Sequence, residues 1–212
     1  MPRKTDRHHQ QGDVSRQRIL EAALEIAAER GYDGTSVALV TEKTGLPASS
    51  IYWHFKNKDS LLAEVLEFSY RNWREVGPTW KASVTQTPFE EQVHARFRDA
   101  AAAFSRKPEF WRLGLMLALE HRVKEPAARG RYIEIRQDTL ARLTEWWSGL
   151  LEQEHPGTSP DVAITLARFH LAAMDGLFVG ANANRGWDLD WLVDTVASGL
   201  AVAARRLTQV AS

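Results

Sequence analysis

The chain has 212 residues, 44% of them hydrophobic, and its formal net charge at pH 7 is zero. That length allows one large domain or two small ones with a substantial buried core. The absence of cysteine excludes a disulfide framework and a thiolate zinc site.

The start of the chain is polar and basic and has no apolar segment, which argues against a secretory signal. The longest strongly apolar run, from Leu113 to Leu119, is too short to span a bilayer. We therefore expect a cytoplasmic protein.

Residues 1–13 are predicted to be a disordered basic tail. The tail could follow a minor groove of DNA, as homeodomain arms do, although a solvated terminus is the commoner outcome. Residues 1–58 hold nine Lys and Arg against seven Asp and Glu, so the excess of positive charge is small. For DNA binding, the placement of these charges on one face matters more than their sum.

A supporting helix and two short helices are predicted after the tail. Ser15 can cap the first, which runs to about Arg30 with apolar residues at helical spacing and Gly31 as its stop. Asp33-Gly34 predicts a turn, after which Thr35 or Ser36 can cap a second helix. The inner stripe of this second helix is Val37, Val40, Thr41 and Thr44.

Gly45 supplies a tight turn into the third helix, Pro47 to His54, with Pro47 suited to the first helical position. Ile51 and Phe55 lie four residues apart, so both can face the core. The helix then turns the following side chains toward solvent or a partner: Ser49, Ser50, Tyr52 and Trp53. This succession of elements predicts a helix-turn-helix.

Asn57 is a plausible N-cap for a fourth helix, which runs from Lys58 to Val76 and ends at Gly77-Pro78. Lys58 falls in the first turn, where the helix dipole disfavours a cation. A bound anion such as a phosphate would remove this conflict. The alternative is a lysine that points into water, partly offset by Asp59.

Between Ser15 and Leu62 the sequence resembles the tetracycline-repressor (TetR) family of bacterial transcriptional regulators. The resemblance rests on Thr35-Ser36-Val37, Gly45-Leu46 and Ile51-Tyr52-Trp53-His54-Phe55, followed by Lys58 and Leu61. It implies that Tyr52, His54 and Lys58 contact phosphates and that Ile51 and Phe55 are core residues. The full set of expected DNA-binding residues is Thr35, Ser36, Ala48, Ser49, Ser50, Tyr52, Trp53, His54 and Lys58.

Two residues depart from the family pattern. Thr41 stands where the family usually has an alanine between helices, which is a small change. Pro47 stands where a serine or threonine usually caps the recognition helix. This second departure leaves the start of that helix uncertain and removes a hydroxyl that could bind phosphate.

Beyond the helix-turn-helix domain (14–57), residues 58–212 are predicted to form an effector-binding and dimerisation domain of successive helices. Pro88, Pro108 and Pro126 each start one helix, Ser159-Pro160 caps a long helix to about Ala183, and a last helix runs from about Asp190 to Leu207. No stretch shows strand-type alternation. The fold class is therefore all-α, with about nine helices.

Small residues on the last two helices predict close helix packing. The resemblance implies that these helices form a four-helix dimer interface, although packing within one subunit would also explain them. The expected interface residues are Ala172, Ala173, Gly176, Gly180, Gly199 and Ala203. A homodimer would read an inverted-repeat operator in double-stranded DNA.

The resemblance also implies a mostly apolar pocket for a small effector, which the eight tryptophans suggest is hydrophobic or aromatic. Each aromatic residue could equally be ordinary core, and His170 a satisfied core histidine. The effector candidates are His94, Trp111, Met116, Glu120, His121, Trp146, Trp147, Phe169, His170 and Met174.

Catalysis is not expected. His121, Asp138 and His170 have no accompanying nucleophile motif, and the sequence has neither a phosphate-binding glycine loop nor a helical pair of metal-ligating histidines. We expect no metal and no cofactor. The sequence therefore predicts a ligand-responsive DNA-binding regulator, most simply a repressor. A helical protein-interaction adaptor is the alternative, but it would leave the cluster of Tyr52, Trp53 and Lys58 unexplained.

Overall fold

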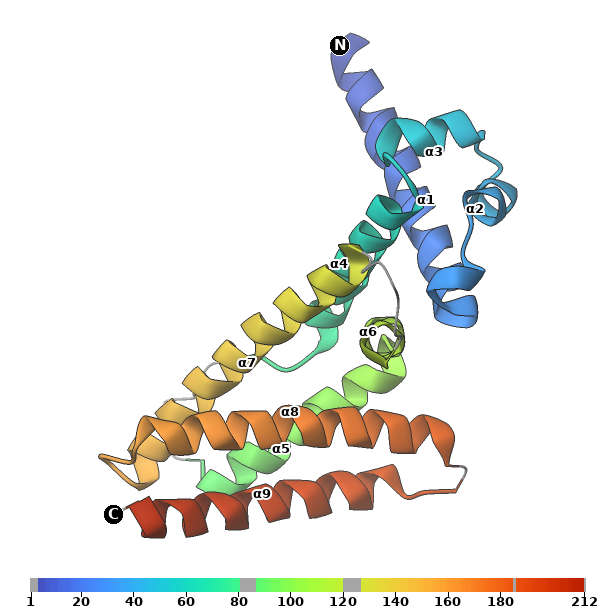
Figure 1. The fold of residues 1–212 in the computed structure, drawn as a ribbon. Coiled ribbons are helices and arrows are strands. Elements are labelled where there is room, and N and C mark those ends of the chain that lie inside the picture. The colour runs from blue at the N-terminus through green and yellow to red at the C-terminus, as the bar shows by residue number, and fades with distance from the viewer. Residues whose placement is uncertain (1–3, 81–86, 120–126, 185, 212) are drawn as a thin grey trace. The chain divides into compact units, whose positions relative to one another are not determined.

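The computed structural model describes residues 4–80, 87–119, 127–184 and 186–211, and all regular structure in these ranges is helical (Figure 1). The prediction of an all-α chain is thus confirmed. In chain order the helices are α1 (Lys4–Gly34), α2 (Val37–Thr44), α3 (Ala48–His54), α4 (Lys58–Val76), α5 (Phe89–Arg106), α6 (Glu109–Leu119), α7 (Ala127–Glu154), α8 (Pro160–Ala183) and α9 (Leu189–Ala211).

The chain divides into two compact units. Unit 1 comprises Met1–Trp73 and Glu109–Glu134, and unit 2 comprises Arg74–Pro108 and Ile135–Ser212. Two of the three divisions fall within α4 and α7, so each of these helices contributes to both units, and the third lies between α5 and α6. The boundary expected from the sequence after residue 57 separates the helix-turn-helix from the rest of the chain, and it stays a prediction.

Helix α1 starts at Lys4, eleven residues before the predicted cap at Ser15. The Ser15 hydroxyl does not cap a helix start but donates to the carbonyl of Gly12, one turn earlier, at 2.9 Å. The expectation of a disordered tail up to residue 13 is therefore wrong from Lys4 onward. The predicted stop at Gly31 is confirmed, because this residue has φ 70° and interrupts the helical backbone.

The caps of the next helices follow from short polar residues and one glycine. The Ser36 hydroxyl accepts from the N–H of Leu39 at 3.2 Å, and Gly45 ends α2 with φ 69°. Asn57 caps α4, since its side-chain oxygen accepts from the N–H of Ser60 at 2.8 Å. Pro47 differs from expectation: it takes the cap position in an extended conformation, and α3 begins at Ala48 without a side-chain cap.

Unit 1 is held together around α1, which packs on α2, α3 and α6. Ile19, Ala23 and Ala27 on α1 are fully buried. The first turns of α7 cross α6 at Gly114, where the ring of Tyr132 occupies the space that a Cβ would take. A second aromatic group lies in the same unit, with the Tyr70, Trp73 and Phe110 ring centroids 5.1 to 6.3 Å apart.

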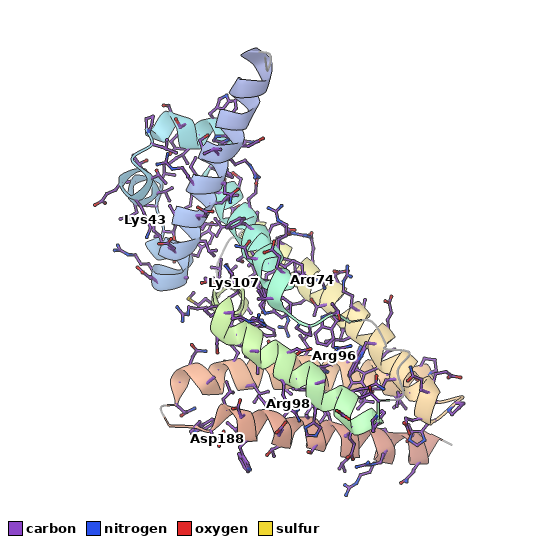
Figure 2. All side chains as sticks on the ribbon, turned by 180° about the vertical axis from the view of Figure 1, so that it is seen from behind. Lys43, Arg74, Arg96, Arg98, Lys107 and Asp188 are labelled. Carbon is purple, nitrogen blue, oxygen red and sulfur yellow. The ribbon has the colours of Figure 1, made fainter. Side chains whose placement is uncertain are left out.

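Unit 2 is built on α5, α8 and α9, each of which contacts the other two. Helices α8 and α9 run side by side in opposite directions (Figure 1). Ion pairs join α5 to α9: Arg98 lies 3.0 Å from Asp194, and Arg205 contacts Glu90 at 2.5 Å. Figure 2 shows Arg98 extending from α5 on the side of α9.

Helix α8 is long and apolar enough to cross a membrane by length and composition alone. Half of its most apolar window is buried inside the protein, as in the core helix of a globular fold. Because buried core helices pass the same test, α8 is weak evidence for a membrane.

Candidate nucleic-acid interface and buried aromatic cluster

Helix α3 is anchored by two apolar side chains in unit 1. Ile51 is 1% exposed and Phe55 is 2% exposed, as their spacing predicted. Arg16 of α1 lies over the Phe55 ring, 5.6 Å from its centroid. These contacts fix the rotation of α3 about its axis, so its opposite face is presented to solvent.

The solvent face of α3 carries two large aromatic side chains. Tyr52 is 56% exposed and Trp53 is 76% exposed. Ala48 and Ser49 are also exposed, whereas Ser50 is half-buried. Exposed aromatic residues beside hydroxyl groups on a short helix can contact phosphates, sugars and base edges.

His54 ends α3 and is tied to α1. Its Nε2 lies 2.9 Å from the hydroxyl oxygen of Ser15. Partial burial, and next the nearby charge of Arg16, lower the pKa of His54, while Asp13 opposes this change. A neutral His54 can donate a hydrogen bond but does not add a full positive charge to the surface.

Lys58 has contacts of its own within unit 1. Its ammonium group lies 4.8 Å from the centroid of the Tyr32 ring and donates to the carbonyl of Asp33 at 3.3 Å. The side chain is therefore held against the end of α1 and is only half-buried. Both interpretations of Lys58, as a phosphate contact or as a solvent-exposed lysine, stay open. The ammonium group can turn to a phosphate, but in this structure it contacts Tyr32 and Asp33.

Thr35 lies elsewhere than the sequence suggested. It is 1% exposed, and its hydroxyl donates to the carbonyl of Gly31 at 2.8 Å. This hydroxyl is engaged at the kink of α1, and the DNA contact expected of Thr35 stays a prediction. Its neighbour Ser36 is half-buried and caps α2, so its hydroxyl hydrogen remains available to an acceptor.

Two of the candidate effector residues, Trp146 and Trp147, meet at a third, His170. Its ring is stacked on Phe97, with centroids 4.2 Å apart, and is surrounded by Trp80, Trp146 and Trp147 at 5.4 to 6.1 Å. We call these five residues the aromatic cluster. Burial lowers the pKa of His170 to about 3, so the imidazole is neutral at physiological pH.

Trp80 and Phe97 were not among the predicted effector residues. Phe97 lies within α5 and is fully buried. Trp80 follows α4 in a non-helical segment, where periodicity carries no information. In the sequence, the feature that could have drawn attention to Trp80 is its isolated position after Gly77-Pro78.

The other effector candidates do not join the cluster. Phe169 is 49% exposed, and His94 bridges α5 to α9 through Asp194 and Ser198, each at 3.1 Å. Met174 is buried in unit 2, while Trp111 and Met116 belong to unit 1. Glu120 and His121 lie outside the described residues.

The small residues of α8 and α9 separate into two groups. Ala172, Gly176 and Gly199 are exposed, and Ala173 and Ala203 are half-buried. Gly180 is buried, because the Trp187 ring lies within 2.8 Å of the position a Cβ would take. Gly180 therefore permits packing within the chain and does not lie on the expected dimer surface.

A hollow of about 340 Å³ lies apart from all these candidates. Residues of the loop between α7 and α8 and of the end of α9 line it: Glu154, His155, Pro156, Gly157, Thr158, Thr208 and Gln209. Within the described part of the chain, no group of three His, Asp or Glu side chains is arranged to hold a metal ion.

The kinked α1, the capped α2, the turn at Gly45 and the anchored α3 define a helix-turn-helix protein. Residues 19–65 match the family model of bacterial regulatory proteins of the tetR family. Over these residues the chain is similar to the TetR family, and the likeness concerns this N-terminal domain.

Known proteins are similar to part of the chain. The chain is 34% identical over 88 residues to the HTH-type transcriptional regulator AcrR of Shigella flexneri, a match covering 42% of this chain and 40% of that protein. The tetracycline repressor protein class D of Escherichia coli is 29% identical over 94 residues, covering 42% and 43%. The match thus spans about two fifths of the length of these relatives. By name, the first of these relatives is a transcriptional regulator and the second is a repressor.

The fold is similar to solved structures over most of the chain. A putative transcriptional regulator from Saccharomonospora viridis, in complex with choline, has a TM-score of 0.67 and 19% identity, covering 89% of this chain and 96% of that one. A transcriptional regulator from Rhodococcus sp. Rha1 has a TM-score of 0.66 and 22% identity, covering 88% and 95%. At these identities the likeness concerns the fold alone.

Proposed function

We propose that this chain is a cytoplasmic, ligand-responsive transcriptional regulator that binds DNA as a homodimer. The observation that carries the proposal is the solvent face of α3, where Tyr52 and Trp53 are exposed while Ile51 and Phe55 hold the helix. Large exposed aromatic side chains are costly unless a partner covers them. In a helix-turn-helix that partner is the major groove and its flanking phosphates.

In this proposal the α3 helices of two subunits enter successive major grooves of an inverted-repeat operator. Ser49, Ser50 and Tyr52 face base edges, Ala48 and Trp53 pack on the backbone, and Ser36, His54 and Lys58 contact phosphates. The alternative, a protein-interaction adaptor, predicts that substitutions on this surface leave DNA binding unchanged.

Dimerisation is supported by exposed apolar and small residues on α8 and α9. Phe169 and Val179 on α8 are each 49% exposed, and Val202 on α9 is 41% exposed. Ala172, Gly176 and Gly199 lie among them and would permit close approach of helices from a second copy. The predicted interface thus keeps Ala172, Ala173, Gly176, Gly199 and Ala203, without Gly180.

The effector is proposed to be a small, mostly apolar molecule that binds in unit 2. The aromatic cluster supports this, and so does the similar S. viridis protein, whose structure contains choline. Binding would act through α4, which carries residues of both units, and lower the affinity for the operator. A coupling of about 1 to 3 kcal/mol is enough to change occupancy. Release of DNA by the effector would make the protein a repressor.

The test is capture and sequencing of genomic DNA on the purified protein, followed by binding titrations on the enriched fragments. Tyr52→Ala should weaken binding at least tenfold, whereas Ile133→Ala, also an exposed apolar residue of unit 1, should leave it unchanged. Enriched sequences should be inverted repeats, and Gly176→Glu should produce monomers that bind weakly. Recovery of random fragments, or Tyr52→Ala binding like the parent, would contradict the proposal.

A further inference from the structure

His170 is the centre of the aromatic cluster and has no polar partner there. Its side chain is 0% exposed, and within the described residues neither Nδ1 nor Nε2 has a hydrogen-bond partner. A buried imidazole with both nitrogens unpaired is costly, because each nitrogen has lost its bond to water. Buried polar groups of this kind need a reason to be retained.

The tryptophans around His170 share this property. Among the residues the structure describes, the indole N–H groups of Trp80, Trp146 and Trp147 are buried without an acceptor. An indole N–H can only donate, and a neutral imidazole donates once and accepts once. The cluster therefore offers four donors and one acceptor, surrounded by apolar ring faces.

The excess of hydrogen-bond donors over acceptors favours some classes of ligand over others. A cation would be attracted to the ring faces but could not accept a hydrogen bond from any of the four donors. An anion would accept them but would be buried beside residues that carry no charge. A flat, uncharged molecule with carbonyl or ether oxygens satisfies the donors and matches the ring faces.

We infer that the aromatic cluster is the effector site of this protein and that its ligand is a planar, uncharged molecule bearing carbonyl-type oxygen acceptors. This inference rests on the proposed function, which it deepens by naming the chemistry of the effector.

Trp80 is the most exposed member of the aromatic cluster. Trp146 and Trp147 are at most 1% exposed, whereas Trp80 is only half-buried and belongs to the non-helical segment after α4. Its ring meets His170 edge to face at 5.4 Å and Trp146 at 6.2 Å. Entry of a ligand would displace Trp80, the half-buried ring of the cluster.

The test follows the indole N–H signals of ¹⁵N-labelled full-length protein by NMR. Substituting Trp80, Trp146 and Trp147 with Phe one at a time assigns their three signals. The probes are 9-fluorenone, fluorene and choline, which are respectively a planar ketone, the same ring frame without oxygen, and a cation. Fluorenone should move the three signals downfield, and fluorene should bind at least about tenfold more weakly.

His170→Phe keeps a ring but removes both nitrogens, and it should weaken fluorenone binding about tenfold. If this variant does not fold, Trp80→Phe at the half-buried position gives the same comparison. Preferential binding of choline would overturn the inference in favour of a cation site. Unmoved signals with every probe, or cross-peaks showing that bound water already occupies the three N–H groups, would overturn it as well.

The same samples separate this inference from the proposed function. If fluorenone binds at the cluster and leaves DNA affinity unchanged, the site stands and effector control fails. If another compound releases DNA without moving the three signals, effector control stands and this site is wrong.

Discussion

The carboxylate of Asp59, in the first turn of α4, accepts hydrogen bonds from the backbone N–H of Ala127, the first residue of α7, at 2.9 and 3.1 Å. The same carboxylate accepts from the hydroxyl of Tyr32 at 3.0 Å. One half-buried side chain thus joins the end of α1 to the starts of α4 and α7 within unit 1. The Glu67–Arg131 pair at 2.6 Å links α4 and α7 two turns further on.

Removal of this carboxylate should destabilise unit 1. Asp59→Ala leaves the N–H of Ala127 and the hydroxyl of Tyr32 without their acceptor, which should cost about 1 to 3 kcal/mol. Urea unfolding of the purified variant measures the loss. Asp138→Ala is the control, because it breaks an exposed pair with Arg142 that is worth less than about 0.5 kcal/mol. Equal effects of the two substitutions would show that Asp59 does not act as a cap.

Replacing Thr41 with alanine should make the protein more stable. The buried hydroxyl of Thr41 has no hydrogen-bond partner among the described residues, so its removal abolishes a desolvation cost of about 1 kcal/mol. Thr44→Ala should have the opposite sign, since that hydroxyl donates to Val40 at 2.7 Å and accepts from the N–H of Leu46 at 3.2 Å. Thermal unfolding decides both, and a destabilised Thr41→Ala would refute the argument.

Replacing two glycines with alanine should change the stability of the protein in opposite directions. A Cβ on Gly114 would overlap the Tyr132 ring, so Gly114→Ala should cost about 1 to 3 kcal/mol as α6 and α7 separate. Nothing lies within 4 Å of a Cβ on Gly130, and Gly130→Ala should stabilise α7 by about 0.5 to 1 kcal/mol. Chemical denaturation compares the two directly. A neutral Gly114→Ala would mean that the helices adjust without loss.

Stability should fall on mild acidification because of His170. Its pKa is lowered from 6.5 to about 3 in the folded protein, so the unfolded chain binds the extra proton first as the pH falls. The associated stability is complete above pH 6.5 and is lost toward pH 3, amounting to about 2 kcal/mol by pH 5. Urea unfolding at pH 7 and pH 5 measures the slope, which His170→Phe should flatten. An unchanged slope in that variant would assign the acid sensitivity to other groups.

Lys58→Ala should weaken DNA binding by a similar factor for every sequence. Loss of one phosphate contact per subunit reduces the slope of log K against log salt by about one unit for each contact. Anisotropy titrations at several salt concentrations measure this slope. Lys107→Ala removes an equal charge from unit 2 and is the control. An unchanged slope for Lys58→Ala would mean that the ammonium stays on Tyr32 when DNA binds.

The sequence alone determined the helical class and most helix limits, because prolines, caps and glycines act through backbone rules that are local. Gly31, Gly45 and Asn57 take the conformations or hydrogen bonds that their residue types predicted. The orientation of α3 was also readable, since the spacing of Ile51 and Phe55 fixes which face is buried. Pro47 was misplaced by one position, because proline suits both the cap and the first turn.

Only the tertiary structure decided what each side chain meets. Thr35 is buried, and Trp187 fills the space beside Gly180. Both features depend on residues from other elements, which helical periodicity does not connect. The aromatic cluster brings Trp80 and Phe97 to His170 from different parts of the chain, and its unpaired nitrogens become visible only when all the neighbours are known. Hydrogen-bond satisfaction belongs to the packed interior, so no local pattern in the sequence could have shown it.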